Sequence, residues 1–256
     1  MCFDLDAQPP MPPIVGMSAS SGDLELVSAD GTRFAAYAAR AEKPTGAGIV
    51  ILPDVRGLFQ FYKDLAVRFA EAGVDAIAID YFARTAGMTS RDADFEYMPH
   101  VEKTHHTSIA ADVAAAAAYL RSPAGGAARA IFTVGFCFGG GNSFQQAANK
   151  HGLSGVIGFY GPPMRARGET PAPIARVGEF ECPVLGLFGG ADQSIPESDV
   201  HAFDQALTRA GVEHELHIYP GAPHSFFDRR QDDYTDASRD AWTRVLRFIA
   251  AHTPGA

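Results

Sequence analysis

The chain has 256 residues, of which 46% are hydrophobic and 20% charged, and its formal net charge at pH 7 is −9. This length and composition indicate one globular domain with a substantial core, and they exclude a largely disordered chain. The acidic charge argues against nucleic acid and anionic lipid as partners, because both bind basic surfaces.

Residues 1–22 are rich in Pro, Ser and Met and predict an extended N-terminal arm, followed by one domain over 23–256. Taken in chain order, the periodicity predicts strands at 23–27 and 33–40 around a turn at Asp30-Gly31, a strand at 47–53, a helix at 61–72, and a strand at 74–80. A helix at 107–121 follows, then strands at 130–135, 155–160, 183–188 and 214–219, with helices ending near Lys150 and spanning 197–210 and 234–251.

Buried apolar strands that alternate with helices predict a mostly parallel sheet with helices on both faces. An antiparallel hairpin at the N-terminal edge brings the expected count to about eight strands in a single α/β domain. Residues 83–103 have no clear period and are long for a loop. They are interpreted as a lid or a substrate-binding segment.

The residue types also indicate where the protein works and with what. The acidic first residues do not resemble a secretion signal, and no segment approaches the roughly 20 apolar residues of a membrane helix. The cysteines, Cys2, Cys137 and Cys182, form neither a disulfide framework nor a zinc motif. We expect a cytoplasmic protein without membrane contact, metal or cofactor, as a monomer or small homo-oligomer.

A glycine-rich turn joins the strand at 130–135 to the next helix and carries Cys137. The spacing Gly135-x-Cys137-x-Gly139 is that of a nucleophile elbow, with Cys in place of the commoner Ser. Glycines avoid collisions in so tight a turn, and the helix N-terminus favours a thiolate. The N–H of Phe138 would face a developing oxyanion. The alternative is a buried, unreactive cysteine among glycines that only pack.

An acid and a histidine follow later strands in the order that a catalytic triad in such a sheet requires. Asp192 comes after the strand at 183–188, and His224 lies in a Pro/Gly loop after the strand at 214–219. Taken alone, Asp192 could be a turn or helix-cap residue, since Ser194 and Pro196 follow it. The order of the two residues and their positions after late strands together predict His224 as the base and Asp192 as the acid that orients it. The Cys137 thiolate would attack an acyl carbonyl and form a thioester that water hydrolyses.

On these motifs the chain resembles the dienelactone hydrolase family (carboxymethylenebutenolidases) of α/β-hydrolases, from about residue 20 onward. The resemblance rests on the elbow at 135–140, on Gly190-Ala191-Asp192 followed by Pro196, on 221–226, and on Tyr160-Gly161. It implies a single-domain α/β-hydrolase fold and the cleavage of small esters or lactones.

The resemblance also implies roles outside the triad. Asp54 stands where the family has a glutamate that helps to activate the cysteine, and it is one methylene shorter. Val55 would supply the second oxyanion N–H. Arg84 matches an arginine that holds the substrate carboxylate, a task that suits its planar fork. Tyr160 and Ser225 are expected to contact substrate. The alternatives are a turn residue for Asp54 and a solvated charge for Arg84.

One position departs from the family. Asp228 stands where the family has a second arginine, with Arg229 and Arg230 just beyond it. An anion in place of a cation would weaken or redirect the recognition of an acidic substrate. The expected substrate is therefore a small ester or lactone, with or without a carboxylate, and dienelactone is only one candidate.

Three other functions stay open. A broad carboxylesterase or thioesterase would use the same triad on a different substrate. A redox sensor would oxidise Cys137, although no resolving cysteine lies close to it in sequence. A non-catalytic binding protein would have no need of an intact nucleophile, acid and base.

Overall fold

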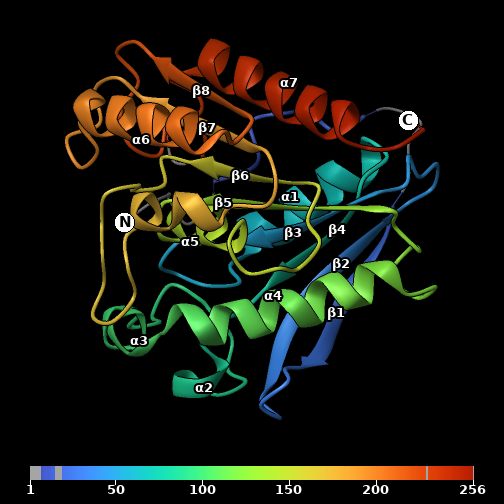
Figure 1. The fold of residues 1–256 in the computed structure, drawn as a ribbon. Helices are drawn as coiled ribbons and strands as arrows, with labels where there is room; N and C mark the ends of the chain where they lie inside the picture. Colours follow the sequence, from blue (N-terminus) through green and yellow to red (C-terminus); the bar gives the residue numbers. More distant parts are fainter. Residues whose placement is uncertain (1–6, 15–18, 229, 256) are drawn as a thin grey trace.

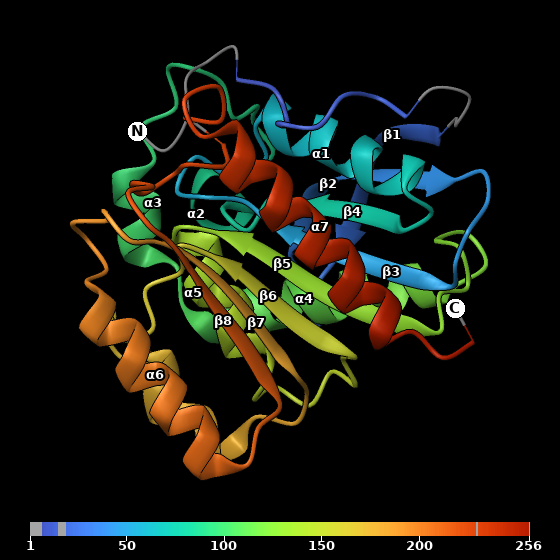
Figure 2. The same ribbon diagram turned by 90° about the horizontal axis from the view of Figure 1, so that it is seen from above.

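One eight-stranded sheet forms the centre of the protein, and helices lie on both of its faces (Figures 1 and 2). The computed structural model describes residues 7–14, 19–228 and 230–255. Much of the predicted arm, together with Cys2 and Arg229, lies outside the described residues.

The strands are β1 (Ala19–Val27), β2 (Arg33–Ala41), β3 (Ala47–Leu52), β4 (Asp75–Ile79), β5 (Ala130–Phe136), β6 (Gly155–Phe159), β7 (Val184–Gly189) and β8 (His214–Tyr219). The helices are α1 (Gln60–Glu71), α2 (Ala83–Ala86), α3 (Met98–Lys103), α4 (His106–Arg121), α5 (Phe138–Gln146), α6 (Glu197–Ala210) and α7 (Thr235–Ala251), with a 3₁₀ helix η1 (Pro173–Glu179). The sheet order is β1-β2-β4-β3-β5-β6-β7-β8. β2 pairs antiparallel with both β1 and β4, and the other pairs are parallel. The predicted fold class is confirmed.

The alternation of side chains along β3 explains why the sheet is covered on both faces. Ile49 and Ile51 point into a core cluster that includes residues of α1 and α7. Val50 and Leu52 point the opposite way, into a second cluster with α4. Figure 2 shows α1 and α7 over the same face. Among the described residues, no helix is both long and apolar enough to cross a membrane.

The segment 83–103 contains the two short helices α2 and α3, and it is anchored to the end of β4. Arg91 forms an ion pair of 2.7 Å with Asp80, and both side chains are almost completely buried. Arg91 also donates hydrogen bonds to the carbonyl oxygens of Gly87 and Thr89. Burial raises the pKa of the Asp80 carboxyl, and the charge of Arg91 opposes that shift. The middle of this segment is thus fixed to the sheet.

Candidate active site

Parallel pairing brings three loops to one edge of the sheet. β5, β6, β7 and β8 all run in the same direction, so their carboxyl ends meet there. Cys137 follows β5, Asp192 follows β7, and His224 follows β8.

The backbone of Cys137 is strained. Its φ of 54° and ψ of −113° lie outside the regions that a non-glycine residue ordinarily adopts. The N–H of Cys137 donates to the carbonyl oxygen of Phe159, at 3.0 Å, which ties the turn to the end of β6. α5 begins at the next residue, so Cys137 stands at the positive end of that helix. Its side chain is partly exposed.

Two glycines make this turn possible. A Cβ atom on Gly135 would lie 2.0 Å from the carbonyl oxygen of Gly139, and one on Gly139 would lie 2.2 Å from the carbonyl oxygens of Leu52 and Pro53. All these obstacles are backbone atoms, which cannot rotate away. The elbow therefore packs directly against the loop that follows β3.

Asp192 and His224 form a short hydrogen bond. The distance between His224 Nδ1 and Asp192 Oδ2 is 2.6 Å. The other oxygen of Asp192 accepts the N–H of Ser194, at 2.8 Å. One oxygen of Asp192 thus serves the turn, and the other holds the imidazole of His224. The side chain of Asp192 is only 1% exposed, whereas that of His224 is 27% exposed and can reach a substrate.

Tyr160 and Ser225 flank the histidine. The ring of Tyr160 lies 5.0 Å from the imidazole, and its side chain is completely buried. Ser225 directly follows His224, has a positive φ of 61°, and is almost completely buried. The structure therefore places these two residues, expected to contact substrate, in buried positions next to His224.

Asp54 and Val55 lie in the loop after β3. Asp54 is completely buried, and its Oδ1 accepts the N–H of Arg56, at 2.9 Å. The hydroxyl of Tyr81 donates to the carbonyl oxygen of Asp54, at 2.7 Å. The N–H of Val55 donates to no acceptor in the part of the chain that the structure describes. The N–H of Phe138, in the first turn of α5, has no acceptor within the helix.

The structure does not leave Arg84 available for a substrate carboxylate. Its Nη1 and Nη2 donate to the two oxygens of Asp112, at 2.7 and 2.8 Å, and its Nε donates to Asp30, at 2.8 Å. Burial lowers the pKa of Arg84, but hydrogen bonds to Asp112 and Asp30 outweigh it, so the pKa is raised overall. Arg84 therefore fastens the β1–β2 turn to α4, an arrangement that does not favour its predicted role in holding a substrate carboxylate.

Asp228, at the position of the family's second arginine, is completely buried. Arg230 forms an exposed ion pair of 2.8 Å with Asp233. Arg229 lies outside the described residues.

Arg167 lies beside the elbow and is not among the predicted site residues. Its guanidinium carbon lies 4.7 Å from the centre of the Phe138 ring, beside the elbow. Arg167 belongs to the irregular stretch between β6 and η1, where no periodicity or motif marks it. A cavity of about 40 Å³ opens here, lined in part by Phe138, Arg165 and Arg167.

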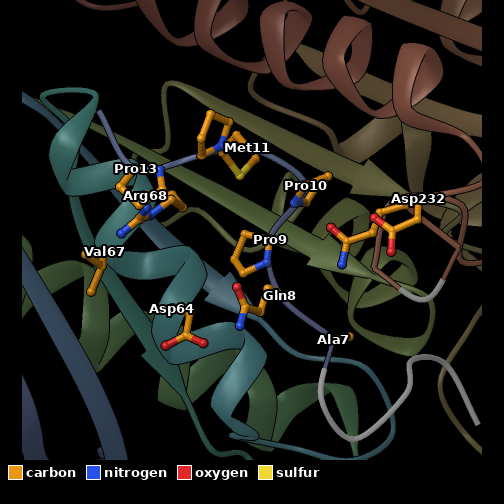
Figure 3. Close-up of a pocket in the computed structure, with 12 residues that line it drawn as sticks. Ala7, Gln8, Pro9, Pro10, Met11, Pro13, Asp64, Val67, Arg68 and Asp232 are labelled. Carbon is orange, nitrogen blue, oxygen red and sulfur yellow. The ribbon is translucent and has the colours of Figure 1, made fainter. Parts of the chain in front are cut away.

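A larger cavity lies elsewhere. Figure 3 shows residues 7–13 running past α1, where they enclose about 650 Å³ together with Arg68 and Asp232. Cys137, Asp192 and His224 do not line it. Within the described part of the chain, no cluster of three or more His, Cys, Asp or Glu residues is arranged to hold a metal ion.

The second described cysteine provides a test of reactivity. Burial raises the pKa of the Cys182 thiol to about 12, and the charge of Glu181 adds to this shift. At pH 8 its thiolate fraction is then only about 10⁻⁴. We expect iodoacetamide at pH 8 to label Cys182 in the folded protein at less than about 1% of the rate for Cys137, as measured by peptide mass spectrometry. Unfolding in urea should abolish the difference, and equal rates in the folded protein would contradict the assignment.

Known proteins are similar to this chain over nearly the whole domain. The sequence model of the dienelactone hydrolase family matches residues 34–253. A Salmonella typhimurium protein with the provisional name carboxymethylenebutenolidase is 30% identical over 247 residues, covering 91% of this chain and 88% of that protein. A crystal structure provisionally named dienelactone hydrolase, from Klebsiella pneumoniae, is 28% identical with a TM-score of 0.79, covering 91% of this chain and 99% of that one. A dienelactone hydrolase-like promiscuous phosphotriesterase from metagenomic libraries, 19% identical with a TM-score of 0.73, shares the fold and covers 92% of this chain and 99% of that one.

Proposed function

Because the chain belongs to the dienelactone hydrolase family and is thus a carboxylic-ester hydrolase, we propose that it cleaves small esters or lactones through Cys137, His224 and Asp192. The observation that carries the proposal is the 2.6 Å hydrogen bond from His224 Nδ1 to Asp192 Oδ2. A buried carboxylate at this nitrogen favours the tautomer with its proton on Nδ1. Nε2 is then the nitrogen that would act as the base.

The proposed reaction has two steps. His224 Nε2 takes the proton of Cys137, and the thiolate attacks the carbonyl carbon while the N–H groups of Phe138 and Val55 stabilise the oxyanion. The C–O bond to the alcohol breaks, the alcohol oxygen receives the proton from His224, and a thioester remains. Water, deprotonated by His224, then attacks the thioester. The acid leaves and the thiol is restored.

Asp54 is assigned to the activation of Cys137. Complete burial of its carboxylate and the direct packing of its loop against Gly139 support this role. When substrate displaces the Asp54 carboxylate from its resting contacts, the ionised carboxylate would favour removal of the proton from the Cys137 thiol.

A broad carboxylesterase or thioesterase is the second candidate function. It is favoured by the pairing of Arg84 with Asp30 and Asp112, and by Asp228 in place of an arginine. Redox sensing has less support, because burial keeps the Cys182 thiol protonated and thus poorly suited to resolve an oxidised Cys137.

Asp192→Asn tests the acid. We expect kcat for small esters to fall by about 10³- to 10⁴-fold, because the amide no longer holds the required tautomer of His224. The amide oxygen can still accept the N–H of Ser194, so the turn should persist. The measurement is steady-state hydrolysis of a panel running from p-nitrophenyl acetate to lactones.

Asp236→Asn is the matched control, because its carboxylate lies at the surface in the first turn of α7. It should retain full activity. If Asp192→Asn kept more than a tenth of the wild-type kcat, Asp192 would not be the acid. If the wild-type protein hydrolysed no member of the panel while Cys137 remained titratable, the proposed function itself would fail.

A further inference from the structure

Arg167 is a half-buried cation next to the reacting group. Its guanidinium stacks on Phe138, the residue whose N–H is assigned to the oxyanion. Burial lowers the pKa of Arg167 and nearby Arg165 lowers it further, while Cys137, Tyr81 and Glu102 act in the opposite direction. Arg167 is thus partly desolvated and lies within electrostatic reach of the Cys137 sulfur.

No carboxylate of the described residues forms an ion pair with Arg167, and Glu102 acts on it only from a distance. Arg176, a third arginine in this region, is engaged by Glu179 and by Gln145. A desolvated arginine without a counterion is costly, and a bound anion would remove that cost.

The lining of the adjoining cavity is cationic. Arg165 and Arg167 contribute to it, and none of the described residues that line it is acidic, although the whole chain carries a net charge of −9. His106 also lines the cavity, but burial lowers its pKa and Arg176 lowers it further, so it is neutral near pH 7. The positive charge of the cavity therefore comes from the two arginines.

We propose that Arg167 binds a carboxylate carried by the substrate, in the cavity beside the elbow. The planar fork of arginine pairs with a carboxylate through two parallel hydrogen bonds, and a cavity of about 40 Å³ suits a group of that size. This inference rests on the proposed function and assigns to it a further specificity-determining residue, in a loop outside the positions that the resemblance marks. Anion recognition is thus assigned to the loop after β6, since Arg84 after β4 is already paired.

The experiment compares each acidic ester with a neutral amide of the same shape. Monoethyl succinate and ethyl succinamate place the charge on the acid part, whereas 4-acetoxybenzoate and 4-acetoxybenzamide place it on the alcohol part. We expect wild-type kcat/KM to favour the acidic member of at least one pair by tenfold or more. Arg167→Gln should lower that preference at least tenfold, mainly through KM, and Arg167→Lys should restore it in part.

Arg84→Gln and Arg209→Gln are the controls. The first removes the arginine that the resemblance suggested, and the second removes one exposed charge from α6. Both should keep the preference for the acidic ester. Arg167→Met, which retains an apolar stem over Phe138, serves as a second test if the glutamine variant does not fold.

Two results would contradict the inference and can be told apart. If wild type hydrolyses neutral esters through Cys137 but Arg167→Gln and Arg167→Met keep the wild-type preference, Arg167 does not bind the carboxylate and the proposed function stands. If wild type prefers the acidic member of neither pair, Arg167 likewise does not bind a substrate carboxylate and the proposed function stands. If no ester of either kind is hydrolysed, the proposed function fails and this inference fails with it.

Discussion

Replacement of Cys137 with alanine is expected to lower kcat for activated esters by about 10⁴-fold or more. The thioester cannot form without the sulfur, so only the oxyanion donors and substrate binding would remain to assist direct attack by water. The strained backbone at this position holds Cys137 at the carboxyl edge of the sheet, the edge at which the loops of Asp192 and His224 also emerge. Hydrolysis of p-nitrophenyl acetate measures the loss.

A second readout identifies the covalent intermediate. Intact-protein mass spectrometry after rapid acid quenching should show an added acetyl group in wild type, and peptide mapping should place it on Cys137. Cys182→Ala is the matched control and should keep both turnover and the acetyl adduct. Turnover of Cys137→Ala above about 1% of wild type, or an adduct on another side chain, would contradict the nucleophile assignment.

Gly139→Ala is expected to lower the free energy of unfolding by about 3 kcal/mol or more, and to lower kcat at least tenfold. A single added methyl group would overlap the carbonyl oxygens of Leu52 and Pro53, at 2.2 Å, so the loop after β3 or the elbow must shift. Either shift would move the N–H of Val55 relative to that of Phe138 and would disrupt the proposed oxyanion site. Urea-induced unfolding, followed by circular dichroism, measures the stability.

Gly178→Ala provides the control for Gly139→Ala. A Cβ atom on Gly178 would meet nothing within 4 Å, and its φ is not positive. Its stability should be unchanged or slightly higher, because alanine restricts the unfolded chain. If the Gly139→Ala variant unfolded at the same urea concentration as wild type, the elbow would be less tightly packed than the structure indicates.

The sheet and its order of elements could be predicted because each strand carries a local hydrophobic pattern. β3 is a continuous apolar run and β5 is interrupted only by Thr133, and both are buried at the centre of the sheet. The alternating segment Asp23–Val27 lies in an edge strand. The exact ends of the strands were harder to predict from the sequence. β1 begins at Ala19, four residues before the predicted start, because backbone pairing with β2 extends it where the side chains give no signal.

In the candidate site, too, some residues could be predicted from the sequence and others could not. Cys137, Asp192 and His224 follow predictable strands, so their meeting at one edge follows from parallel pairing. The partners of Arg84 could not be predicted, because Asp30 lies 54 residues away in a turn and no local pattern joins them. The stacking of Arg167 on Phe138 is likewise a contact between an irregular loop and a helix terminus.

The ion pair between Asp80 and Arg91 has a consequence for how substrate arrives. Swinging the segment 83–103 away from the sheet would separate two almost completely buried charges, which costs about 3 kcal/mol or more. An opened form would then make up less than about one molecule in a hundred. We therefore expect the segment to keep its place during turnover, so that the exchange of substrate and product does not wait for it to open.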